Sequence, residues 1–103
     1  MDVSMRTIPI EETRFFKDLY GTLDAQGQPT GDAPIVSVNG NDMPRGYYNL
    51  IVITTQVDGY VRLGLKPHGS WKFKNIKEYF GIKGKGENVL QYLKDLKTFL
   101  TTE

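Results

Sequence analysis

The fold expected from this sequence rests on residues 47–56, which read Tyr-Tyr-Asn-Leu-Ile-Val-Ile-Thr-Thr-Gln. Aromatic and β-branched residues of this kind are enriched in strands, so the stretch predicts the central strand of a sheet. Residues 57–59, Val-Asp-Gly, are typical of a tight turn with glycine at a positive φ, and residues 60–65 alternate in the manner of a second strand. These runs together predict an antiparallel hairpin.

Upstream of this hairpin the sequence predicts one more strand, one loop and one helix. Positions 35, 36 and 38 are Ile, Val and Val, which favours a strand. Residues 24–33 collect Gly, Pro, Asp and Gln without apolar periodicity and predict a surface loop. A helix is predicted from about residue 9 to residue 20, because Phe15, Leu19 and Leu23 recur at helical spacing.

Downstream of the hairpin the sequence predicts two helices. Asn75 and Glu78 have capping-box spacing, so a short helix should run from residue 76 to about residue 80. From Glu87 onward, apolar residues recur at i, i+4, i+7 and i+11, which predicts an amphipathic terminal helix. The expected fold is therefore α+β, a three-stranded or slightly larger antiparallel sheet with an N-terminal helix and two C-terminal helices on one face. Its core should include Leu50, Val52, Leu93 and Leu96.

Length and composition predict one soluble domain. A chain of 103 residues lies near the commonest domain size, so residues 1–103 should form a single domain, with residues 1–5 poorly ordered. Apolar residues make up 39% of the chain and the net charge is only +1, which is not the composition of a disordered protein. No apolar run approaches the ~18 residues of a membrane span, and no signal peptide is evident. We expect a cytoplasmic protein without membrane contact.

The residue types exclude several classes of enzyme. The chain has no cysteine, hence no disulfide, no thiolate zinc site and no thiol nucleophile. His68 is the single histidine and lies between Pro67 and Gly69, which is the setting of an ordinary turn residue. We therefore expect no enzymatic activity, no metal and no cofactor.

Charges are distributed unevenly along the chain. Residues 1–56 hold four basic and seven acidic residues, whereas residues 57–103 hold nine basic and five acidic ones. Between residues 60 and 86 there are seven Lys or Arg and one acid, Glu78. An anionic partner is expected to meet this stretch. The alternative is a charged face that contacts only water.

Residues 81–86, Gly-Ile-Lys-Gly-Lys-Gly, combine glycines with lysines ahead of the terminal helix. Free backbone N–H groups, a positive helix end and mobile cations together suit a phosphate, although the spacing is not that of a P-loop. The alternative is a connector whose glycines only permit a turn between two helices.

This loop also carries a resemblance. Two helices joined by Gly81-Ile82-Lys83-Gly84 beside a three-stranded sheet resemble the element of KH domains in which a Gly-x-x-Gly loop clamps a single-stranded backbone. The chain departs from that family at Glu87, where KH domains place an apolar residue, and in the order of strands and helices. We therefore do not assign it to the family.

These features predict a non-enzymatic binding module that contacts single-stranded nucleic acid through its basic, aromatic C-terminal half. Trp71 would stack on a base if it is exposed, and belongs to the core if it is buried. Two other functions stay open: a protein-interaction, inhibitor or accessory module that meets an acidic protein surface, and a binder of a small anionic ligand such as a nucleotide. The oligomeric state is undetermined, and a dimer is compatible with the sequence. The residues expected to bind nucleic acid or another anion are Arg62, Lys66, Trp71, Lys72, Lys74, Lys83, Gly84, Lys85 and Gly86.

Overall fold

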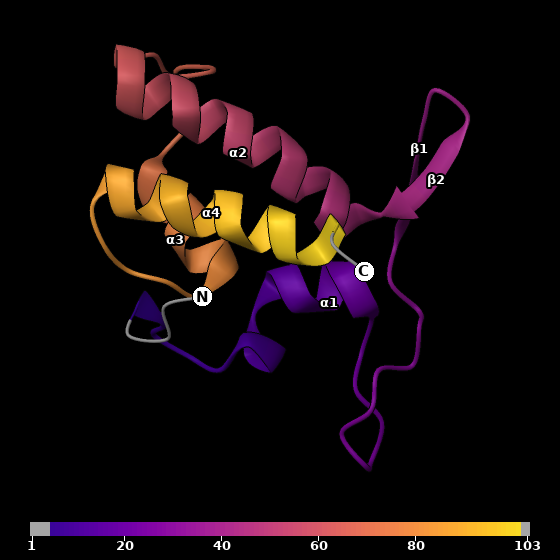
Figure 1. Cartoon of the computed structure of the whole chain (residues 1–103). Coiled ribbons are helices and arrows are strands. Elements are labelled where there is room, and N and C mark those ends of the chain that lie inside the picture. The colour runs from indigo at the N-terminus through magenta and orange to yellow at the C-terminus, as the bar shows by residue number, and fades with distance from the viewer. Residues whose placement is uncertain (1–4, 102–103) are drawn as a thin grey trace.

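The computed structural model describes residues 5–101, which form a mostly helical α+β fold of four α-helices, a short 3-10 helix and a two-stranded antiparallel hairpin. Figure 1 shows α2 and α4 running alongside one another, with α1 and α3 packed against them. The elements in chain order are η2 (Ile10–Glu12), α1 (Arg14–Tyr20), β1 (Ile35–Val38), β2 (Asn41–Pro44), α2 (Arg45–Leu63), α3 (Phe73–Phe80) and α4 (Gly86–Thr101).

The predicted strands at residues 47–56 and 60–65, and the hairpin between them, are wrong. One continuous helix, α2, covers all but the last two of these residues. Its buried residues Gly46, Leu50, Thr54 and Val57 are spaced at i, i+4, i+8 and i+11, which is the period of a helix. The strand preference of β-branched residues is weak, and packing of this buried face against α1 and α4 overrides it.

The C-terminal end of α2 explains why the predicted turn at residues 57–59 does not form. The helix continues through Gly59 and ends at Gly64, which adopts the left-handed conformation with φ 69°. The N–H of Gly64 donates to the carbonyl of Tyr60 at 3.0 Å, and the N–H of Leu65 donates to the carbonyl of Gly59 at 3.3 Å. Glycine adopts this conformation without steric cost, so the helix stops at residue 64.

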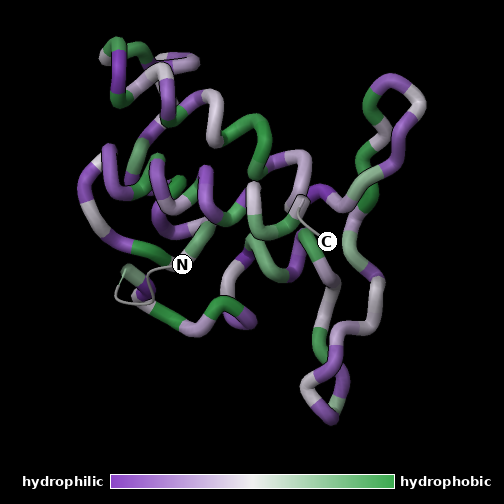
Figure 2. The backbone as a smooth tube through the Cα atoms, in the orientation of Figure 1, coloured by the Kyte–Doolittle hydropathy of each residue, from purple (hydrophilic) through white to green (hydrophobic). Residues whose placement is uncertain are grey.

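The sheet is a single hairpin of β1 and β2. The strand predicted at residues 35–38 is confirmed, and it pairs with residues 41–44, with Val38 opposite Asn41 and Ile35 opposite Pro44. Asn39 and Gly40 form the two-residue turn and both have positive φ, 53° and 82°, which matches the twist of a hairpin. Figure 1 shows the hairpin extending away from the helices, and Figure 2 shows apolar residues along β1.

The N-terminal helix predicted at residues 9–20 is broken in two. η2 covers residues 10–12, and Thr13 adopts an extended conformation with φ −81° and ψ 153° before α1 begins. The Thr13 hydroxyl accepts a hydrogen bond from the N–H of Phe16 at 3.0 Å, which caps α1. Of the segment expected to be poorly ordered, residues 1–4 lie outside the described residues, whereas Met5 packs against the core.

Both predicted C-terminal helices are confirmed. α3 begins at Phe73, earlier than expected, so Asn75 lies within the helix, and Lys72 occupies the N-cap position without a side-chain cap. Residues 24–33 form no helix or strand and are exposed except for Ala33, which agrees with the predicted loop.

The core lies where the four α-helices meet. Leu50, Leu93 and Leu96 are buried there as predicted, whereas Val52 is only half-buried. Gly46 allows α2 to touch α1, because a Cβ at this position would lie 2.7 Å from the backbone nitrogen of Leu19. None of the helices in residues 5–101 has the length and apolar run that a membrane crossing requires. The buried apolar side chains are Phe15, Leu50, Val57, Trp71, Ile76, Phe80, Ile82, Val89, Leu90, Tyr92, Leu93 and Leu96.

Candidate functional site

Several segments that carry the predicted cations meet at one end of the molecule. Figure 1 places the end of α2, the loop before α4 and the start of α4 at the same end, opposite the hairpin. Six cations here are exposed, and Glu78 is the one acid between residues 60 and 86. We call this surface the basic end, and its cations are Arg62, Lys66, Lys72, Lys74, Lys83 and Lys85.

Most of these cations have no acidic partner among residues 5–101. Arg62 lies 3.6 Å from Asp58, and Lys74 lies 3.9 Å from Glu78, both one turn along a helix. Exposed pairs of this kind contribute little to stability and exchange readily with other anions. Within residues 5–101 no carboxylate lies within ion-pair distance of the remaining four cations, which are Lys66, Lys72, Lys83 and Lys85.

The first part of the loop at residues 81–86 is held by the N-terminal segment. Ile82 is buried, and the backbone N–H of Lys83 donates to the carbonyl of Met5 at 2.8 Å. The N–H of Thr7 donates to the carbonyl of Gly81, also at 2.8 Å. The N-terminal segment therefore fixes the backbone of residues 81–83, while the side chains of Lys83 and Lys85 are exposed to solvent.

Gly84 and Gly86 have packing roles in addition to any role in binding. The carbonyl of Gly84 accepts a long hydrogen bond of 3.4 Å from the Lys77 ammonium. A Cβ at Gly86 would lie 2.9 Å from a methyl group of Val61, so the glycine lets α4 begin directly against α2. The interpretation of these two glycines as parts of a connector between helices therefore has structural support. Binding of a phosphate by this loop would depend on its lysines.

Trp71 does not form an exposed stacking platform. Only 6% of the residue is exposed, and its indole N–H donates to the side-chain oxygen of Gln56 at 3.2 Å. Its ring lies 5.0 Å from that of Tyr60. The alternative in which Trp71 belongs to the core is therefore the correct one, because its contacts with Gln56 and Tyr60 of α2 bury the ring.

The aromatic groups next to the basic end are Tyr60 and Phe73, which sequence reasoning did not select. Their rings are stacked with centroids 5.4 Å apart, and both residues are half-buried. The Lys77 ammonium lies 5.4 Å from the centre of the Phe73 ring, which is a cation–π contact. The alternation of aromatic and basic residues from 71 to 74 was a sequence signal for Phe73, and it does not include Tyr60.

A groove of about 460 Å³ lies between the end of α2 and the start of α4, and the basic-end cation that lines it is Lys85, beside the acid Glu87. One wall comes from the end of α2, with Tyr60, Val61 and Gly64. The other comes from the loop and the start of α4, including Lys85 and Gly86. The groove places the turn at Gly64 next to the loop at residues 81–86, although these segments are about twenty residues apart in sequence.

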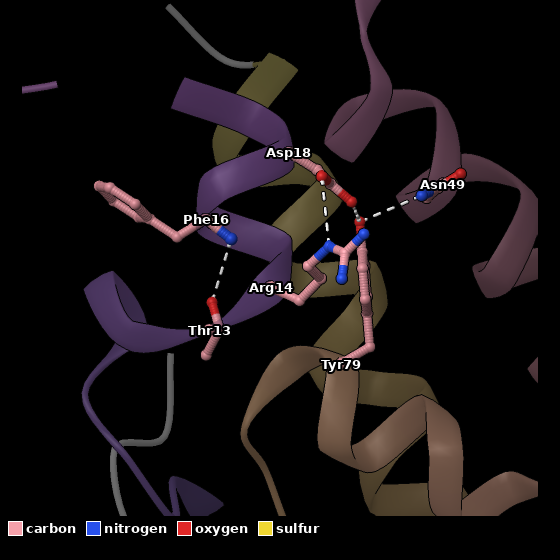
Figure 3. Close-up of polar contacts among 6 residues, drawn as sticks. All are labelled: Thr13, Arg14, Phe16, Asp18, Asn49 and Tyr79. Atoms are coloured by element: carbon pink, nitrogen blue, oxygen red, sulfur yellow. Dashed lines mark hydrogen bonds and ion pairs between the residues drawn. The ribbon is translucent and has the colours of Figure 1, made fainter. Parts of the chain in front are cut away.

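A second polar cluster lies among α1, α2 and α3, and Figure 3 shows its side chains. Asp18 is 5% exposed and accepts a hydrogen bond from the Tyr79 hydroxyl at 2.7 Å. The Asn49 amide donates to the same hydroxyl at 3.1 Å, and Arg14 lies 3.7 Å from Asp18. Burial and the neighbouring Asp18 carboxylate raise the pKa of Tyr79, so the phenol stays protonated. This cluster holds three helices together.

The single histidine of the sequence lies in an exposed turn. His68 is exposed and its Nδ1 lies 2.9 Å from the Ser70 hydroxyl, within the turn where the sequence placed it. Among residues 5–101 no three side chains of the types that bind metals are grouped together.

Comparisons with known proteins assign the chain to no family. No protein-family model matches the chain, and no curated protein and no solved structure matches it either. The KH resemblance also loses its structural basis, because the loop at residues 81–86 joins two helices that lie beside no three-stranded sheet. The structure therefore defines a mostly helical α+β protein with a basic end.

Proposed function

We propose that this protein binds nucleic acid through the phosphate groups of the backbone, using the cations of the basic end. The observation that carries the proposal is that six cations between residues 62 and 85 are exposed, with Glu78 as the one acid in that stretch and Glu87 two residues after it. Clustered cations raise the local concentration of a polyanion and release its counterions on binding.

The proposal rests on phosphate contacts and not on base stacking by Trp71. A buried indole offers no face to a base, so stacking gives no reason to prefer single strands. Phosphates are presented by single strands and duplexes alike, and both belong in the test.

The test is a measurement of binding to a single-stranded oligonucleotide, to the duplex of the same sequence and to heparin, each across a salt series. Phosphate contacts predict that the logarithm of the binding constant falls linearly with the logarithm of the salt concentration. Tighter binding to either oligonucleotide than to heparin would support nucleic acid over a general polyanion. A chain that binds neither oligonucleotide at low salt would contradict the proposal.

One observation favours a second function, contact with another protein through the hairpin. Ile35 is 61% exposed, and residues 33–44 contain no cation and one acid, Asp42. A partly apolar arm without cations suits a protein surface better than a phosphate backbone. Replacing Ile35 with Ser should then weaken binding to a protein partner and leave binding to oligonucleotides unchanged.

A further inference from the structure

Two leucines at the end of α2 are exposed to solvent. Leu63 is 71% exposed and Leu65 is 59% exposed, one on each side of Gly64. They belong to residues 62–70, a stretch that is exposed throughout. Burial of apolar side chains is favourable, so a complex in which a partner covers both leucines would be stabilised by their removal from water.

The backbone presents these leucines on a fixed turn. Gly64 closes α2, and the N–H groups of Gly64 and Leu65 both return to carbonyls of the last helical turns, Tyr60 and Gly59. The turn is therefore tied to a helix of 19 residues. Side chains held in this way insert into a partner with a smaller entropic cost than side chains on a loose loop.

The surroundings of the leucines are cationic. Arg62 and Lys66 flank them in sequence, and residues 59–77 include no acid. Gly64, between the two leucines, lines the same groove as Lys85. A partner seated in this groove therefore meets Lys85 and the backbone of the turn that carries the leucines.

We infer that Leu63 and Leu65 insert between base pairs of duplex DNA while the cations of the basic end hold the phosphates on either side. The inference rests on the proposed function and names the form of nucleic acid. A duplex offers apolar base faces bordered by phosphates, which matches apolar side chains bordered by cations. Leucine is one of the side chains that wedge open a base step, and the opened step bends the duplex.

The test uses the full chain and a duplex that carries the fluorescent base 2-aminopurine at a TA step, because such steps unstack easily. Binding of the parent should raise the fluorescence of the base as it leaves the stack. The variant with Leu63→Ala and Leu65→Ala should bind about tenfold more weakly, without the fluorescence rise and with an unchanged salt slope. Phe99→Ala is the matched control, because Phe99 is 66% exposed at the far end of α4.

The outcomes separate the inference from the proposed function. If the Leu63→Ala, Leu65→Ala variant binds the duplex with the affinity of the parent and raises the 2-aminopurine fluorescence equally, the inference is overturned. The proposal of nucleic-acid binding is then unaffected. A parent that binds DNA without any fluorescence rise would also overturn it. Leucine-dependent binding to vesicles of phosphatidylserine and phosphatidylcholine, with no binding to DNA, would assign the leucines to a membrane surface and contradict both proposals.

Discussion

The hydroxyl of Tyr79 on α3 donates a hydrogen bond of 2.7 Å to Oδ2 of Asp18 on α1. Asp18 is buried, so its carboxylate depends on this donor, with the exposed Arg14 3.7 Å away on the other oxygen. The Asn49 amide adds α2 to the same cluster (Figure 3). One phenol therefore connects three helices that are far apart in sequence.

Replacing Tyr79 with Phe should lower the free energy of unfolding by ~1–3 kcal/mol, because the buried Asp18 loses its hydroxyl donor. Urea unfolding of the parent and the variant measures the difference. Tyr20→Phe is the control, since Tyr20 is 40% exposed and should change stability by much less. Equal effects of the two variants would show that the hydrogen bond to Asp18 contributes nothing.

The same phenol predicts a loss of stability at alkaline pH. Burial, followed by the contact with Asp18, raises the pKa of Tyr79, and burial also raises the pKa of Tyr92. Below the ordinary tyrosine pKa of about 10, both the folded and the unfolded state carry these protons, so neither group affects stability. Above it, the unfolded state binds fewer protons than the folded state, and the free energy of unfolding falls as pH rises.

Urea unfolding between about pH 8 and about pH 11 checks this dependence. The decline above about pH 10 should be shallower in Tyr79→Phe, which has no phenol to ionise at this position. A decline as steep as that of the parent would show that Tyr79 is not a source of the alkaline sensitivity.

Gly46 and Gly59 both lie in α2, and replacing each of them tests the contact between α1 and α2. A Cβ at Gly46 would lie 2.7 to 2.9 Å from backbone atoms of α1, whereas a Cβ at Gly59 would meet nothing within 4 Å. Gly46→Ala should therefore destabilise the protein by roughly 1–3 kcal/mol, and Gly59→Ala should stabilise it by roughly 0.5–1 kcal/mol. Thermal melting of both variants gives the signs. Stabilisation by Gly46→Ala would contradict the close approach of the two helices.

The terminal helix gives a simpler test of the core. Leu93 is fully buried, and truncating it to Ala should cost ~2–5 kcal/mol in free energy of unfolding. Lys94→Ala, at the adjacent exposed position, should change stability by less than ~0.5 kcal/mol. Melting of Leu93→Ala at the temperature of the parent would show that α4 does not pack as described.

Regular apolar spacing predicted the C-terminal elements correctly. Val89, Leu93 and Leu96 repeat at helical intervals and lie on the buried face of α4. α2 was missed because its middle, from Ile51 to Thr55, is β-branched throughout, and local preference suggested a strand. Its helical period was present at Gly46, Leu50, Thr54 and Val57, but two of those residues are not apolar.

The sequence predicted the cations of the candidate site, but it did not predict which aromatic side chains are buried beside them. Counting cations along the chain identified the basic end, because its members are close in sequence. The burial of Trp71 depends on its contacts with Tyr60 and Gln56, which no local pattern contains. The support that Met5 gives to Lys83 joins opposite ends of the chain and was equally invisible in the sequence.

The central claim is that Lys83 and Lys85 hold phosphate groups. Changing both to Glu replaces attraction by repulsion on a loop whose backbone is held by other contacts, so the fold should melt as the parent does. The control variant, Lys94→Glu with Lys97→Glu, makes the same change in net charge on exposed positions of α4.

The most direct measurement is the salt dependence of oligonucleotide binding by the parent and both variants. We predict that the Lys83→Glu, Lys85→Glu variant binds more weakly to every sequence, and that its log–log salt slope on duplex shrinks by about 0.9 for each phosphate that the variant no longer binds. The control variant should keep the slope of the parent. If the Lys83→Glu, Lys85→Glu variant binds with the affinity and slope of the parent, or if the parent binds no nucleic acid at low salt, the account is contradicted.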